Sequence, residues 1–205
     1  MDSPDTAELL FWGLAQLGNR QRKLLEAFHF DGQSMRALAK ELGDNLPEDG
    51  NIRYFAGDLR QKLTIANLLS ATLDAFDRVD ILVNASRQMI AADPLDPEDR
   101  TLETLIAQNV MTGYRLSQAF ARRMIAQAER DEEEDGPAGT IINISSIAAR
   151  RTQPHLLAYS VSVAAVDQMT RSLAVALAPH RIRVNAVAFG SVMSASLEGA
   201  LKEHE

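Results

Sequence analysis

From residue 51 onward, the hydrophobic positions of the chain alternate between two patterns. Short apolar runs predict strands at residues 51–57, 79–84, 139–144 and 181–187. Between them, apolar residues recur at three- and four-residue spacings, which predicts helices at residues 63–76, 102–128 and 159–178. Strands joined by helices of this length favour a parallel sheet, since a parallel connection needs about a dozen residues or more. We therefore expect an α/β fold, a doubly wound parallel sheet of Rossmann-like type with helices on both faces.

The first part of the chain is less regular. Helical spacing extends over residues 20–30 and 34–42, and a short segment that begins with Asp31-Gly32 separates these two stretches, with no convincing strand between them. An acidic segment at residues 131–137 lies between a predicted helix and a predicted strand, and it is typical of a solvated loop. Because 205 residues suffice for one domain with a sizeable core, we predict a single domain over residues 1–205.

The composition argues against several classes of binding partner and site. The net charge of −7 argues against a nucleic acid or an anionic membrane surface as partner, because phosphates require a basic face. No run of 18 apolar residues is present, so we expect no membrane span. The absence of cysteine and the scattered positions of the four histidines argue against a metal site. The acidic start lacks the basic region of a secretory signal, and together with the lack of cysteine this predicts a cytoplasmic protein.

Two hydroxyl groups stand out at the junctions of predicted elements. Ser146 follows the predicted strand at residues 139–144, and Tyr159 lies thirteen residues later at the start of a predicted helix. A serine in this place can simply cap a turn, and a tyrosine can simply pack in a core. In a shared cleft, however, the tyrosine could exchange a proton with a substrate oxygen that the serine holds.

Further residues, in order and spacing, complete a pattern. Gly57-Asp58-Leu59 follows one predicted strand, Val83-Asn84-Ala85-Ser86 ends the next, and Asn109 lies inside the long helix. Together with Ser146 and Tyr159, they resemble the short-chain dehydrogenase/reductase family from about residue 51 to residue 193.

The resemblance implies a function and a site. It implies hydride transfer between NAD or NADP and a small-molecule carbonyl or alcohol, with Ser146, Tyr159 and Asn109 as catalytic residues. It implies cofactor contacts for five residues near strand ends, which are Asp58, Leu59, Asn84, Ala85 and Ser86. The family opens with a glycine-rich turn for the cofactor phosphate, and its nearest match here contains Gly13 and Gly18. An N-terminal helix with incidental glycines is the other interpretation of that segment. Neither the substrate nor the choice between NAD and NADP follows from these residues.

One position departs from the family pattern at the centre of the site. The family has a lysine four residues after the tyrosine, where both side chains share a helix face, and this chain has Val163. A cation about 4 Å from a phenolate stabilises it by about 4 kcal/mol at an effective dielectric of about 20. The same lysine binds the nicotinamide ribose. We therefore expect impaired catalysis, which Arg87, Arg150 or Arg151 could relieve only in part.

Two interpretations of function remain. The first is an NAD(P)-dependent oxidoreductase, and the alternative is a non-catalytic family member that acts as a binding or assembly scaffold. Compared with the family, the N-terminal portion is altered and the last strand is missing. Members commonly associate through two long helices, here residues 102–128 and 159–178, so we expect a homodimer or homotetramer.

Overall fold

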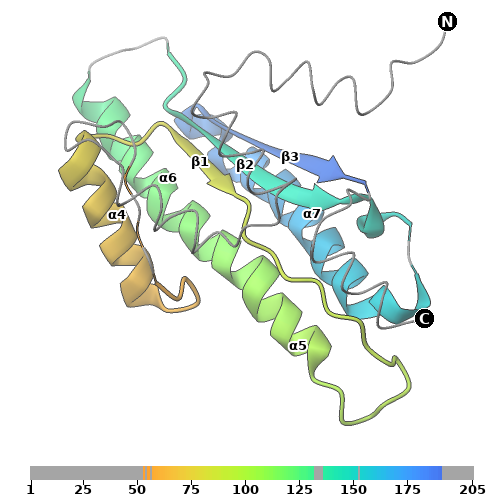
Figure 1. Ribbon diagram of the computed structural model, residues 1–205. Coiled ribbons are helices and arrows are strands. Elements are labelled where there is room, and N and C mark those ends of the chain that lie inside the picture. Colours follow the sequence, from red (N-terminus) through yellow and green to blue (C-terminus); the bar gives the residue numbers. More distant parts are fainter. Residues whose placement is uncertain (1–52, 54, 56, 132–135, 152, 191–205) are drawn as a thin grey trace, which may run out of the picture. The chain divides into compact units, whose positions relative to one another are not determined.

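The computed structural model describes residues 53, 55, 57–131, 136–151 and 153–190 (Figure 1). Every described helix and strand belongs to one compact unit, Phe55–Ser191. The strand predicted at residues 51–57 lies largely outside the described residues. The two stretches predicted as helical between residues 20 and 42, together with Gly13 and Gly18, lie entirely outside them. The single domain over residues 1–205 therefore stays a prediction.

Three parallel strands form the described sheet. They are β1 (Ile81–Asn84), β2 (Gly139–Ser146) and β3 (Ile182–Phe189), in the order β1-β2-β3. The register pairs Leu82 with Ile141, and Ile141 in turn with Val184. These strands confirm the predicted parallel sheet and its Rossmann-like class. Each strand begins and ends within two residues of the predicted bounds.

The described helices connect the strands in the predicted order. They are α4 (Lys62–Phe76), α5 (Thr101–Leu105), α6 (Thr112–Arg130) and α7 (Leu157–Leu177). A π-helical segment, Ile106–Met111, separates α5 from α6, so the single helix predicted at residues 102–128 is interrupted. There are also three short 3-10 turns among the described residues: Ile147–Ala149 follows β2, Pro154–Leu156 precedes α7, and Ala178–His180 follows α7.

The core lies between the sheet and α6 and α7, and α4 adds to it where it packs against α6. The α6 helix packs on β1 and β2, and α7 packs on β2 and β3, as Figure 1 shows. The buried side chains of this core share an apolar character and come from both layers: Ile65, Val79, Leu82, Leu116, Phe120, Ala121, Met124, Ile141, Ile182 and Val184. Each large aliphatic side chain that is buried contributes about 1.5–3 kcal/mol. On β1, Ile81 and Val83 are 63% and 51% exposed, so the described helices cover one face of the sheet.

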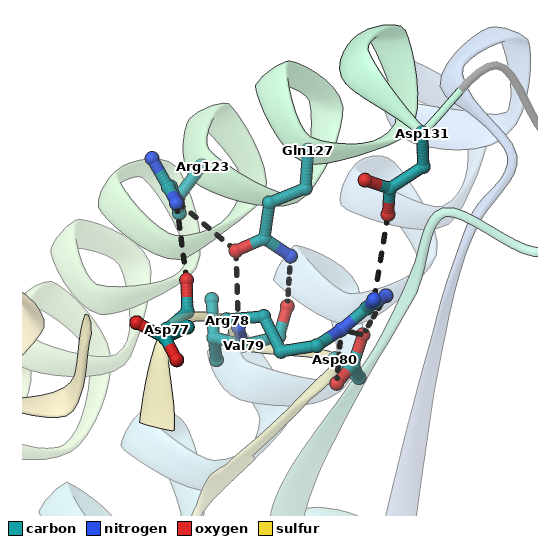
Figure 2. A network of polar contacts seen from close by, with 7 residues as sticks. All are labelled: Asp77, Arg78, Val79, Asp80, Arg123, Gln127 and Asp131. Carbon is teal, nitrogen blue, oxygen red and sulfur yellow. Dashed lines mark hydrogen bonds and ion pairs between the residues drawn. The ribbon is translucent and has the colours of Figure 1, made fainter. Parts of the chain in front are cut away.

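A glutamine on α6 fixes the start of β1 (Figure 2). The Gln127 side chain donates from Nε2 to the carbonyl of Val79 at 2.8 Å and accepts from the Val79 N–H at 3.0 Å. Arg123 donates to the Gln127 Oε1 at 3.0 Å and to the carbonyl of Asp77 at 3.2 Å. The chain enters this segment through Asp77, whose left-handed conformation (φ 63°) ends α4. The network sets where β1 begins against α6.

Candidate active site

The carboxyl end of β2 places Ser146 at a turn. Its hydroxyl oxygen accepts the N–H of Ala148 at 3.2 Å and so caps the 3-10 turn Ile147–Ala149. The serine is 7% exposed. A hydroxyl that accepts one hydrogen bond still has its own proton to donate. Ser146 therefore has the capping role that its local sequence suggested, and it keeps a donor at the sheet edge where ligands of such folds bind.

Tyr159 lies in the first turn of α7 and is 4% exposed. It packs in an apolar cluster with Leu105, Ala148, Ala158 and Val163. Ala148 belongs to the turn that Ser146 caps. The turn after Ser146 and the helical turn that carries Tyr159 therefore contact each other in this cluster. Among the hydrogen bonds between described residues, none joins the hydroxyls of Ser146 and Tyr159.

The side chain of Asn109 makes three hydrogen bonds in the site. Its Oδ1 accepts the N–H of Gln88 at 2.7 Å, and its Nδ2 donates to the carbonyl of Gln88 at 2.8 Å. The same Nδ2 donates to the hydroxyl of Ser162 at 3.0 Å, and that hydroxyl donates to the carbonyl of Tyr159 at 2.8 Å. Asn109 thus connects the loop after β1 to the helical turn that carries Tyr159.

The π-helical segment explains how Asn109 reaches these partners. One extra residue in a turn changes the direction of the side chains, and such segments occur often at functional sites. At its end, the hydroxyl of Thr112, the first residue of α6, donates to the carbonyl of Ala107 at 3.3 Å. Sequence reasoning missed Ser162. Its available signal was a small hydroxyl residue three positions after Tyr159, where serine can bond back to the helix carbonyl.

Asn84 belongs to a second network, which crosses the sheet. It donates to the Oδ1 of Asn143 at 2.8 Å and to the hydroxyl of Ser117 at 3.1 Å. Asn143 donates in turn to the hydroxyl of Thr170 on α7 at 2.9 Å. The Oδ1 of Asn84 is buried without a partner among the described residues, so it is the atom of this network that can still accept a hydrogen bond. Sequence analysis did not identify Asn143.

The other residues predicted to contact a cofactor differ in their surroundings. Ala85 and Ser86 follow β1 directly and are exposed. Leu59 is partly buried and packs against the main core. The Asp58 carboxylate accepts from Arg60 Nε and Nη2, each at 2.8 Å, and from the Arg60 N–H at 3.0 Å. These hydrogen bonds with Arg60 lower the pKa of Asp58 from 3.8 to about 2.

Val163 occupies the position where the family pattern has lysine, and it is 1% exposed. Its neighbours in the cluster include the apolar Leu105 and Ala148 and also Tyr159, which carries a hydroxyl but no cation. A cavity of about 510 Å³ lies nearby on the outer side of α7, and its lining includes Gln153, Leu157, Ser160 and Val161 but neither Ser146 nor Tyr159. The hydroxyl of Ser160 is buried without a hydrogen-bond partner among the described residues.

Two other kinds of site were sought in the described part of the chain. It contains no group of three or more His, Asp or Glu side chains that could hold a metal ion. Nor does any helix in that part have the length and apolar character needed to cross a membrane.

Known proteins resemble this chain over most of its length. The family model described as short chain dehydrogenase matches residues 24–205, a match that begins after Gly13 and Gly18. Carbonyl reductase [NADPH] 2 of Sus scrofa is 35% identical over 169 residues, which cover 81% of this chain and 64% of that protein. Sorbitol dehydrogenase of Cereibacter sphaeroides is 33% identical over 160 residues, which cover 78% of this chain and 57% of that protein.

A solved structure agrees with these relatives. The crystal structure of a short-chain type dehydrogenase/reductase from Mycobacterium marinum superposes with a TM-score of 0.63 at 27% identity, over 75% of this chain and 59% of that one. The chain thus spans about two thirds or less of the length of these relatives. The match of the family model covers far more than half of the sequence, and the parallel sheet agrees with it. The chain belongs to the short-chain dehydrogenase family.

Proposed function

We propose that this protein is an NAD(P)-dependent oxidoreductase that acts on a carbonyl or alcohol substrate. Tyr159 donates or accepts the proton, Ser146 holds the substrate oxygen, and Asn109 supports the site. The observation that carries the proposal is the hydrogen-bond chain from Asn109 through Ser162 to the carbonyl of Tyr159. It gives the tyrosine a fixed position beside the turn that Ser146 caps, which is what proton transfer to a held oxygen requires.

The residues at the carboxyl edge of the sheet fit a nicotinamide cofactor in part. Asn84 has a buried acceptor without a partner, and Ala85 and Ser86 are exposed beside it. Asp58 and Leu59 would lie along the adenine, although Arg60 already engages the Asp58 carboxylate. When bound, the cofactor supplies or accepts the hydride. The pig relative is named for NADPH, and the binding titrations below compare both cofactors.

Val163 lowers the activity that this site can reach. General acid–base assistance contributes about 10²–10⁴-fold, and it depends on a stabilised phenolate. A buried valine cannot stabilise that charge, and it cannot hold the ribose. The same observation favours the second candidate function, a non-catalytic family member that keeps the fold and acts as a binding or assembly scaffold.

Cofactor binding separates the two candidates. Titration with NADH and with NADPH, followed by fluorescence, is expected to show saturable binding of at least one of them. Absence of binding at millimolar concentrations would leave the scaffold as the function. Both titrations use the full chain, because Gly13 and Gly18 lie in it.

A substitution at Val163 then tests the catalytic assignment. Val163→Lys restores a cation one helical turn from Tyr159, so turnover with a panel of aldehydes is expected to rise about 10²-fold or more. Val163→Met is the matched control, because it adds length without charge and should give no gain. Thermal unfolding of both variants monitors the cost of placing an amine among Leu105, Ala148 and Tyr159. A folded, cofactor-binding Val163→Lys variant without any gain would contradict the role of Tyr159.

The assembly and location are proposed on the same basis. The protein forms a homodimer or homotetramer through α6 and α7. The corresponding helices commonly pair between subunits in the family. On α7, Leu157 and Val161 are exposed apolar residues, and Ala164 beside them allows close approach of another helix. The protein acts in the cytoplasm, consistent with its lack of cysteine.

A further inference from the structure

Arg87 places a cation at the carboxyl edge of the sheet. It follows Ser86 in the loop after β1, is exposed, and donates from Nη1 to the carbonyl of Ser145 at 2.8 Å. Ser145 directly precedes Ser146 at the end of β2. The guanidinium therefore lies next to the serine that would hold the substrate oxygen, at the edge where ligands bind in open α/β sheets.

The backbone that carries Arg87 is held on both sides. Asn84, three residues before it, is fixed by the network with Asn143 and Ser117. Gln88, the next residue, has both its N–H and its carbonyl bound by the side chain of Asn109. An arginine on so constrained a backbone loses little freedom when it binds a ligand, which favours binding.

The charge of Arg87 has no protein counterion in the described part of the chain. No ion pair between described residues includes Arg87. By contrast, Arg60, Arg78 and Arg100 each pair with a carboxylate. The one described hydrogen bond goes to a neutral carbonyl and leaves most of the five N–H groups of the guanidinium available. That planar group matches two oxygens of a carboxylate at once.

We propose that Arg87 is a specificity-determining residue that binds a carboxylate of the substrate, so that the preferred substrate is an aldehyde, ketone or alcohol that also carries an acid group. This inference rests on the proposed oxidoreductase function. The substrate, rather than the cofactor phosphate, is the source of the anion, because Arg87 lies beside Ser145 and Ser146. The family's turn for the cofactor phosphate matches residues near Gly13 and Gly18 instead.

A pair of aldehydes that differ in charge tests the proposal. 4-Formylbenzoate and its methyl ester have the same reacting group, and only the first carries a carboxylate. In the native protein, or in the Val163→Lys variant if its turnover is higher, kcat/KM is expected to favour the acid by roughly tenfold or more. Arg87→Gln should remove that preference, and Arg87→Lys should retain part of it. Arg122→Gln, which removes an exposed arginine on α6, is the control and should retain it in full.

Each outcome decides the assignment. Equal kcat/KM for the two aldehydes in the native protein, or an unchanged preference in Arg87→Gln, would overturn it. A tenfold loss of NADH and NADPH affinity in Arg87→Gln with the preference intact would assign the arginine to the cofactor instead. If no variant turns over, the proposed oxidoreductase function fails separately. Calorimetric titration of 4-formylbenzoate and its ester then decides, since only binding that needs both the carboxylate and Arg87 supports the proposal.

Discussion

The carboxylate of Asp58 shows how the surroundings of one side chain change its availability. Its place after a predicted strand, in the family pattern, indicated a cofactor contact. In the structure, Arg60 holds it through four hydrogen bonds of 2.8–3.1 Å. A carboxylate has about four acceptor positions, and these four hydrogen bonds occupy them, so a ligand that contacts Asp58 must compete with Arg60.

The pKa of Asp58 gives a prediction with a definite sign. Arg60 lowers this pKa from 3.8 to about 2. Because the folded state favours the ionised form, the stabilisation is fully present above pH 3.8 and is lost as the pH falls through about 2. In Arg60→Gln, the NMR titration midpoint of Asp58 is expected to move up toward 3.8.

Asp99 provides a reference within the same titration. Its pKa is lowered by hydrogen bonds with Thr101, which the Arg60 substitution does not touch. Its midpoint should therefore stay constant in Arg60→Gln. An Asp58 midpoint that also stays constant would show that Arg60 is not the cause of the low pKa.

The long helix before β2 shows what its hydrophobic pattern leaves open. Apolar spacing predicts one helix over residues 102–128, and the structure divides it into α5, a π-helical segment and α6. Apolar spacing did not separate the π-helical turn from the α-helix, because a single wider turn adds only one residue to a pattern that already mixes spacings of three and four. From this segment, Asn109 binds the backbone N–H and carbonyl of Gln88, a contact that the apolar pattern does not encode.

The contact between α6 and the start of β1 predicts a large effect of one substitution. Gln127→Leu keeps the approximate volume of the side chain but leaves the buried N–H and carbonyl of Val79 without partners. The free energy of unfolding is expected to fall by roughly 2–4 kcal/mol, measured by urea denaturation. Gln118→Leu, on the exposed side of the same helix, is the matched control with a change near zero. Equal effects of the two substitutions would show that the Val79 contact contributes nothing.

Across the molecule, α7 combines three roles. Its inner side packs on β2 and β3, its first turn carries Tyr159, and its outer side exposes Leu157 and Val161. Exposed apolar residues around a cavity of about 510 Å³ are typical of a surface that another chain covers. The proposed association through α6 and α7 would bury them.

Sedimentation tests this association. The native protein is expected to sediment as a multiple of 22.5 kDa, and Val161→Glu as the monomer, because an acidic side chain in the interface would lose its hydration. Leu63→Glu, which makes the same kind of change on the exposed side of α4, should leave the assembly intact. A native protein that sediments only at 22.5 kDa would reject the proposal.

Local patterns in the chain were sufficient for the class of fold and for the main candidate residues. Apolar periodicity depends on which face of a strand or helix is buried, so it predicted the parallel strands and placed Ser146 and Tyr159 at element ends. The departure at Val163 was visible in the same way, since its offset from Tyr159 is one helical turn.

The hydrogen-bond partners could not be predicted in this way. Asn109 and Ser162 are 53 residues apart, Asn84 and Asn143 are 59 apart, and Arg87 and Ser145 are 58 apart. Many polar residues along the chain could satisfy such groups equally well, and a one-residue change of register would select different ones. Only the packing of α6 and α7 against the sheet brings these particular pairs within reach, and for the buried groups, such as Asn109 and Ser162, burial also removes the water that could bond instead.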